Sequence, residues 1–265
     1  MKKMLTLLCL FATLAMQADV LVCDKAAEKK ATFTQNSYKF APKIITENDK
    51  TFFRVDGRIS LLSDATVKVK PDKLYVISVK LRAARNASKA LLGVAAYDAQ
   101  GRLISQTNLL PMPKTFTTLS RPCKKGDTSF FITKGNDWTK GGFTPAFNVK
   151  EDASDVPCFT LDNMNNNVKE VKENDDDFEV TMLYPMKNDY PAGTTVRLQR
   201  QGAPFSYVVN KAVETEWTEW RSKPTKGESL RKGAATLRPV LICNLGFPKE
   251  SLDFDELCIE EVSAP

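Results

Sequence analysis

Histidine is absent from this chain of 265 residues. Imidazole is the usual general base near neutral pH and the commonest zinc ligand, so Ser-His-Asp triads and the commonest zinc sites are excluded. The glycine-rich motifs of phosphate-binding loops, dinucleotide-binding folds and serine hydrolases are also missing. We therefore predict no catalytic residue and no enzymatic activity. Two carboxylates that converge in space for glycoside hydrolysis leave no sequence motif, and this alternative stays open.

Cysteine is sparse, and no two cysteines form a C-x-x-C motif, which leaves zinc-ribbon and thioredoxin-like sites without support. Cys9 lies in an N-terminal leader, so an odd number remains after it. Connectivity cannot be read from a sequence. The pairs closest along the chain are Cys123 with Cys158 and Cys243 with Cys258, which would leave Cys23 as the spare thiol, and buried free thiols are the alternative.

Long apolar runs are lacking outside the N-terminus. Residues 1–18 combine a basic start at Lys2 and Lys3 with an apolar centre over 4–15, the pattern of a bacterial export signal. The run is shorter than the ~20 residues that a spanning helix needs. We expect a secreted, periplasmic or cell-surface protein with no membrane insertion. Residues 19–32 read as a leader or linker.

Excess charge is small. The formal net charge of +6 falls to +4 when Lys2 and Lys3 are removed with the leader, and the basic residues are evenly spread. This balance gives no indication of nucleic-acid binding.

Most of the chain consists of segments in which apolar and polar residues alternate, as they do in β-strands. Within residues 74–83 the side chains of Tyr75, Ile77, Val79 and Leu81 alternate with more polar ones, which predicts a strand with one buried face. Residues 91–97 are apolar on both faces, as in a strand inside a sandwich. No helical stripe of useful length follows the leader. The sequence predicts an all-β fold, a jelly-roll β-sandwich.

The composition changes between residues 121 and 204. This segment holds a hairpin pattern around residues 168–183 and a Tyr190-Pro191-Ala192-Gly193 turn. We predict a small β-barrel-like subdomain inserted into a jelly roll of residues 33–120 and 205–265.

Four stretches resemble carbohydrate-binding modules of families four and nine, within the galactose-binding-like jelly rolls. They are VKVKPDKLYVIS at 67–78, LGVAAYDAQGRLI at 92–104, EWTEW at 216–220 and FDELCIEEV at 254–262. Their order and their positions at the two ends of one domain carry the resemblance. It implies a non-catalytic protein that binds a polysaccharide or other glycan.

Sugar binding stacks aromatic faces on pyranose rings. The resemblance places Trp217 in the core. Trp220, three residues on, faces the opposite side of a strand, and Trp138 lies in a glycine-flanked loop. We therefore predict Trp220, Trp138 and Tyr207 as the ligand-binding residues.

No cofactor is required for such binding, but these jelly rolls often carry a structural calcium ion. Glu47, Asp49 and Asp255 supply hard oxygen ligands of the kind calcium prefers. Solvated turn carboxylates are the simpler interpretation of the same residues.

The alternative to glycan binding is a structural or adhesive surface protein that presents the inserted β subdomain to a protein partner.

Overall fold

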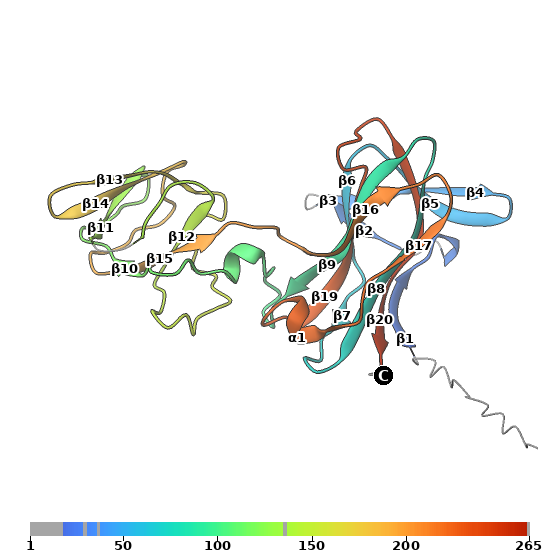
Figure 1. Ribbon diagram of the computed structural model, residues 1–265, viewed down its shortest axis with the longest axis horizontal. Helices are drawn as coiled ribbons and strands as arrows, with labels where there is room; N and C mark the ends of the chain where they lie inside the picture. Colours follow the sequence, from blue (N-terminus) through green and yellow to red (C-terminus); the bar gives the residue numbers. More distant parts are fainter. Residues whose placement is uncertain (1–17, 29–30, 36–37, 135–136, 264–265) are drawn as a thin grey trace, which may run out of the picture.

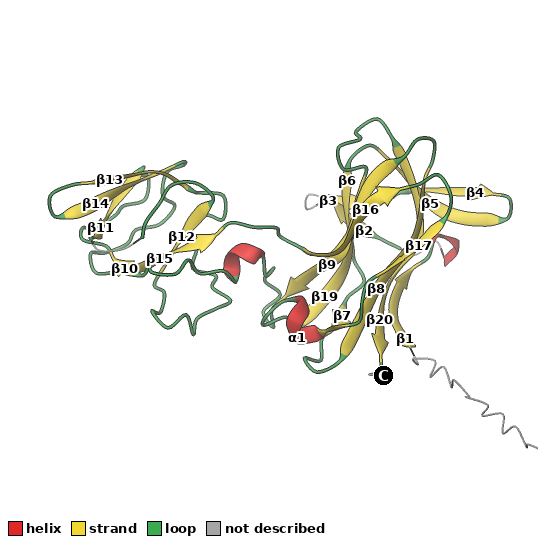
Figure 2. Ribbon diagram, in the orientation of Figure 1, coloured by secondary structure: helices red, strands yellow, loops and turns green. Residues whose placement is uncertain are grey.

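The computed structural model describes residues 18–28, 31–35, 38–134 and 137–263. Strands dominate this part of the chain, and they pair antiparallel (Figures 1 and 2). The helical segments of the described ranges are short: η1 (Ala26–Glu28), η2 (Gln106–Asn108) and α1 (Gly227–Leu230). The predicted all-β sandwich fold is confirmed.

Two sheets form the first lobe. The β8 sheet has the order β17-β8-β20-β5-β4, with β1 beside β20 and β18 beside β8. Its strands are β1 (Ala18–Asp24), β4 (Lys43–Glu47), β5 (Lys50–Asp56), β8 (Leu74–Ala83), β17 (Thr218–Arg221), β18 (Thr225–Lys226) and β20 (Ser251–Val262).

The β9 sheet faces it, with the order β16-β9-β19-β6-β2-β3 and β7 beside β19. Its strands are β2 (Phe33–Gln35), β3 (Tyr38–Phe40), β6 (Ile59–Ser63), β7 (Val67–Lys68), β9 (Ser88–Tyr97), β16 (Ser206–Val213) and β19 (Thr236–Cys243).

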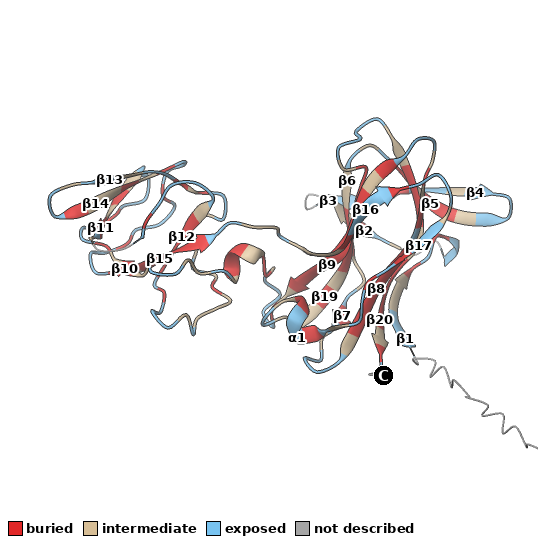
Figure 3. Ribbon diagram, viewed as in Figure 1, coloured by how far each residue is buried: buried red, intermediate tan, exposed pale blue. Residues whose placement is uncertain are grey.

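The core of the first lobe lies between these two sheets. Ile77 and Leu81 from β8 meet Leu92 from β9 there, together with Phe53 and Phe254. The side chains of residues 74–83 that alternate in the sequence therefore point in turn into this core and toward the outer face of the sheet. Each such side chain contributes roughly 1.5–3 kcal/mol on burial. Figure 3 shows the buried positions concentrated on the central strands.

Gly93 on β9 lets β16 approach closely. A Cβ at this position would lie 2.2 Å from the backbone oxygen of Ser206, which no side chain can occupy. Gly93 pairs with Tyr207 in the ladder, next to a register shift between Tyr207 and Val209. The glycine is thus required by the strand that packs against it.

The second lobe consists of two three-stranded sheets formed by the chain between β9 and β16 (Figure 1). One has the order β10-β15-β12 and the other β11-β14-β13. The strands are β10 (Thr117–Thr118), β11 (Ser129–Thr133), β12 (Phe143–Phe147), β13 (Val168–Glu173), β14 (Asp177–Met182) and β15 (Thr195–Arg200). Both sheets contribute to one core, in which the rings of Phe147 and Tyr190 stack with centroids 3.9 Å apart.

Parts of the expected segmentation differ from the structure. The segment 19–32, expected to be a linker, contains most of β1 and all of η1. Its pattern was uninformative because β1 is a mostly exposed strand whose partner, β20, lies at the other end of the chain. The strand β10, expected in the first lobe, pairs with β15 of the second. Of the export signal predicted over 1–18, residues 1–17 lie outside the described residues.

Candidate functional site

The strand β20 changes its partner in the middle. Its first part pairs with β5, from Ser251 opposite Asp56 to Phe254 opposite Phe53. From Leu257 onward the same edge pairs with β1. At the change, the ladder between β20 and β8 is irregular between Asp255 and Cys258, as in a β-bulge. A β-bulge changes the direction in which the neighbouring side chains point, and bulges are common next to functional sites.

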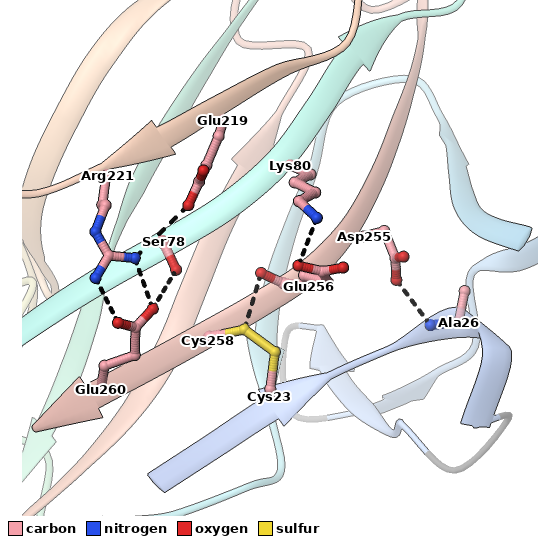
Figure 4. The surroundings of a disulfide bond; sticks show 10 residues. All are labelled: Cys23, Ala26, Ser78, Lys80, Glu219, Arg221, Asp255, Glu256, Cys258 and Glu260. Carbon is pink, nitrogen blue, oxygen red and sulfur yellow. Dashed lines mark hydrogen bonds and ion pairs between the residues drawn. A yellow bond between two sulfur atoms is a disulfide. The ribbon is translucent and has the colours of Figure 1, made fainter. Parts of the chain in front are cut away.

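Glu256, in the middle of this irregularity, has a φ of 51°. That left-handed conformation is uncommon for a residue with a side chain and costs energy that the surroundings must offset. Its carboxylate forms an ion pair with Lys80 of β8, with an N–O distance of 2.8 Å (Figure 4). The unusual backbone therefore places a paired charge on the outer face of the β8 sheet.

A cavity of about 520 Å³ opens over this bulge. The volume is within the roughly 300–1,000 Å³ range of ligand sites. We call it the bulge pocket, and it is lined by Ala27, Lys50, Thr51, Phe52, Lys80, Trp217, Thr218, Glu219, Asp255 and Glu256. It brings together β5, β8, β20, η1 and the start of β17, which are far apart in the sequence.

Trp217 and Phe52 form the aromatic part of the bulge pocket. Their rings meet edge to face with centroids 5.4 Å apart. Phe52 is buried, whereas Trp217 is half-buried and lies just before β17. A smaller cavity of about 140 Å³ shares Lys50, Phe52 and Trp217 with the pocket.

The guanidinium of Arg82 holds these two rings in place from one side. Its carbon lies 5.1 Å from the ring centroids of both Phe52 and Trp217. Arg82 donates through Nε to Asp253, at 2.9 Å, and through Nη2 to Glu47, at 2.7 Å. Because Arg82 is fixed by two carboxylates and two rings, the aromatic wall is organised before any ligand arrives.

Asp255 supplies a carboxylate on the side of η1. Its Oδ1 accepts a hydrogen bond of 2.9 Å from the backbone N–H of Ala26. Burial raises the pKa of Asp255 above its usual range, because the half-buried carboxylate loses solvation. With Glu219, Glu256, Lys50 and Lys80, the pocket offers both acceptors and donors beside an aromatic face. This combination suits a ligand that carries several hydroxyl groups.

The predicted roles of the two neighbouring tryptophans were wrong. Trp220 is 7% exposed and packs in the core of the first lobe, whereas Trp217 lines the bulge pocket. Residues three apart face opposite sides of a strand, as expected. The alternation does not say which side of the strand faces the core. The resemblance placed Trp217 in the core and Trp220 outside, and the structure has the reverse.

The other two predicted aromatic residues do not join this site. Trp138 is 6% exposed, and its Nε1 donates to the carbonyl of Thr115, at 2.8 Å, inside the second lobe. Its glycine-flanked loop folds inward because the indole completes that core. Tyr207 is half-buried beside Phe205 on the outer face of the β9 sheet. The three predicted binding residues thus belong to three different hydrophobic clusters.

The carboxylates predicted to hold calcium do not form one site. Glu47 is engaged by Arg82 and Arg54, Asp49 is exposed in the turn after β4, and Asp255 accepts from the backbone. Within the described ranges no three acidic or cysteine side chains converge as metal ligands do.

Cys23 and Cys258 form a disulfide across β1 and β20, where they are direct partners in the ladder (Figure 4). The pairs that are closest along the chain, Cys123 with Cys158 and Cys243 with Cys258, do not form, and Cys123, Cys158 and Cys243 are free and buried. Burial raises the pKa of the Cys123 thiol to about 11, so it is unreactive at neutral pH. Distance along the chain does not indicate the true pair, because the last strand, β20, lies beside β1 in the sheet.

No pattern in the sequence singled out the charged residues of the pocket, Lys80, Glu219 and Glu256. The one available signal was the FFRV run of β5, in which Phe53 and Val55 face the core and Phe52 therefore faces outward. An aromatic residue on the outer face of a strand indicates a binding surface or a cover.

No family model matches the chain, and no curated protein or solved structure does either. None of the helices in the described ranges has the length and apolar character that crossing a membrane requires.

Proposed function

We propose that this protein is an exported, non-catalytic glycan-binding protein whose ligand occupies the bulge pocket. The observation that carries the proposal is the aromatic wall of Trp217 and Phe52, held by Arg82 beside an open cavity with polar groups on the other sides. Pyranose rings stack on such faces while carboxylates and ammonium groups bind their hydroxyls. The resemblance to carbohydrate-binding modules supports the same function.

Export is supported by two independent features. The first 18 residues have the composition of an export signal. The disulfide between Cys23 and Cys258 is of the kind that persists in oxidising compartments. A secreted, periplasmic or cell-surface location brings the pocket into contact with polysaccharides.

A glycan array of plant, algal and host polysaccharides tests the function, followed by calorimetry with the best ligand. Trp217→Ala removes the stacking face and is expected to weaken binding at least about tenfold, which corresponds to 1.4 kcal/mol. Tyr184→Ala is the matched control, because Tyr184 is 54% exposed on the second lobe and does not line the pocket. An array without any ligand, or equal affinities of the two variants, would rule the proposal out.

Absence of catalysis is tested on the same ligands. We expect no release of reducing ends when the protein is incubated with each polysaccharide that it binds. Release that is abolished by Asp255→Asn would instead assign the pocket to glycoside hydrolysis.

One observation favours the alternative of an adhesive surface protein. Leu183 and Tyr184 are each about half exposed in the second lobe, and the side chain of Asn166 bonds both backbone groups of Tyr184. This holds the exposed Met164 loop beside them. A protein partner captured from envelope extracts by the wild type and lost on Tyr184→Ala, together with a blank glycan array, would establish this function instead.

A further inference from the structure

One wall of the bulge pocket is made by the N-terminal segment of the described chain. Ala27 lines the cavity, and the N–H of Ala26 holds the carboxylate of Asp255. The turn η1 that contains them also contacts β5, which carries Phe52. The pocket therefore depends on where residues 24–28 are held.

Among the described strands, β1 pairs with β20 alone, so one ladder and the buried Ala26 hold this segment to the lobe. Residues 18–21 of β1 are exposed, with Val20 61% exposed, and the ladder to β20 is irregular between Val20 and Val22. Val22 packs on the core only partly. Asp24 is buried, but its Oδ2 has no hydrogen-bond partner among the described residues. A terminal strand that is paired along one edge is easier to release than a central strand paired along both.

The disulfide adds a covalent link between β1 and β20, and it lies next to the pocket. Cys258 is two residues after Glu256 and three after Asp255, both of which line the cavity. The Sγ atom of Cys258 lies 3.1 Å from the carbonyl oxygen of Glu256 (Figure 4). A thiol formed there by reduction would donate a hydrogen bond to that oxygen, so the state of the sulfur bears directly on the bulge.

We propose that the Cys23–Cys258 disulfide is a redox switch for the bulge pocket: its reduction releases β1 and η1, removes one wall of the cavity and lowers affinity for the ligand. The part that concerns affinity rests on the proposed glycan binding. The part that concerns the wall does not, since it follows from the contacts of Ala26 and Ala27 and from the way β1 is held to β20.

The reductant is a dithiol. Cys23 is half-buried whereas Cys258 is 5% exposed, so the attacking thiolate reaches the sulfur of Cys23. A mixed disulfide with Cys23 forms, and Cys258 leaves as a thiolate that takes up a proton. The second thiol of the reductant then attacks the mixed disulfide and displaces the Cys23 thiolate. The protein gains two electrons and two protons, and the reductant leaves as its own disulfide.

Amide hydrogen exchange of the oxidised and the dithiol-reduced full chain tests the switch without any ligand. On reduction we expect exchange in residues 18–28 and 255–258 to become at least tenfold faster. Exchange in β9 and β19, the central strands of the facing sheet, should not change, which shows that the first lobe remains folded. Unchanged exchange at 18–28 and 255–258 would overturn the inference.

A double variant, Cys23→Ala with Cys258→Ala, provides the control. It should exchange like the reduced wild type, and adding the dithiol should have no further effect, since the three remaining cysteines are free thiols with no disulfide to reduce. A dithiol effect that persists in the double variant would overturn the inference.

Affinity for the best glycan is measured in the same samples and should fall at least tenfold on reduction. Faster exchange with unchanged affinity would overturn the switch as a control of binding. If the oxidised protein binds no glycan, the proposed function fails, while hydrogen exchange still decides whether the wall is released.

Discussion

Asp24 gives the protein a defined dependence of stability on pH. The residue is 7% exposed at the end of β1, and its Oδ2 is unpartnered among the described residues. Burial raises its pKa from 3.8 to about 6, against the lowering effect of the nearby Ser63 hydroxyl and with a smaller contribution from the negative charge of Asp64. At 1.36 kcal/mol per pKa unit, the ionised carboxylate costs the folded state roughly 3 kcal/mol.

The direction follows from the sign of the shift. Because the folded pKa is higher than the unfolded one, folding favours the protonated acid. This contribution to stability is complete below about pH 4 and is lost as the pH rises through about 6. At pH 7.5 the wild type therefore carries the whole cost of the buried charge.

Asp24→Asn removes the charge and keeps the shape. Urea unfolding of the oxidised protein should show the variant more stable than the wild type by on the order of 1–3 kcal/mol at pH 7.5, and about equal to it at pH 4. Asp49→Asn is the control, since Asp49 is exposed in a turn. A variant that is less stable at pH 7.5, or whose difference from the wild type is the same at both pH values, would refute this account of Asp24.

Two other substitutions probe the first lobe by the same unfolding assay. Gly93→Ala places a Cβ against the backbone of Ser206 and should destabilise the fold by about 1–3 kcal/mol; an unchanged midpoint would show that β16 can move away. Asp253→Ala removes a fully buried carboxylate that accepts hydrogen bonds from Arg54 and Arg82. It should cost about 3–5 kcal/mol and reduce ligand affinity, because two guanidinium groups lose their partner; a loss below 1 kcal/mol would contradict the assigned role.

Sequence periodicity was sufficient for the fold class. The alternation in β8 and the run of β9 that is apolar on both faces are properties of single strands. Each pattern therefore indicates which faces of that strand are buried without knowledge of its neighbours. Periodicity does not report absolute orientation. It correctly places Trp217 and Trp220 on opposite faces, but the identity of the inner face depends on what the strand packs against.

The bulge pocket was beyond prediction for a different reason. It exists where β20 changes partner from β5 to β1, and neither the change nor the bulge at Asp255 leaves a local pattern. The same holds for the disulfide, since Cys23 and Cys258 are 235 residues apart and meet only because the first and last described strands pair. Contacts of this range depend on the whole topology.

The second lobe leaves and rejoins the first at almost the same point. The N–H of Gln106 donates to the carbonyl of Ala203, and the N–H of Ala203 donates back to the side chain of Gln106. Beyond this clasp, β9 and β16 are already paired as neighbouring strands. The second lobe therefore occupies the position of a loop between two adjacent strands. The second lobe can therefore be deleted or replaced between residues 106 and 203, and natural variation in its size would leave the β-sandwich of the first lobe intact.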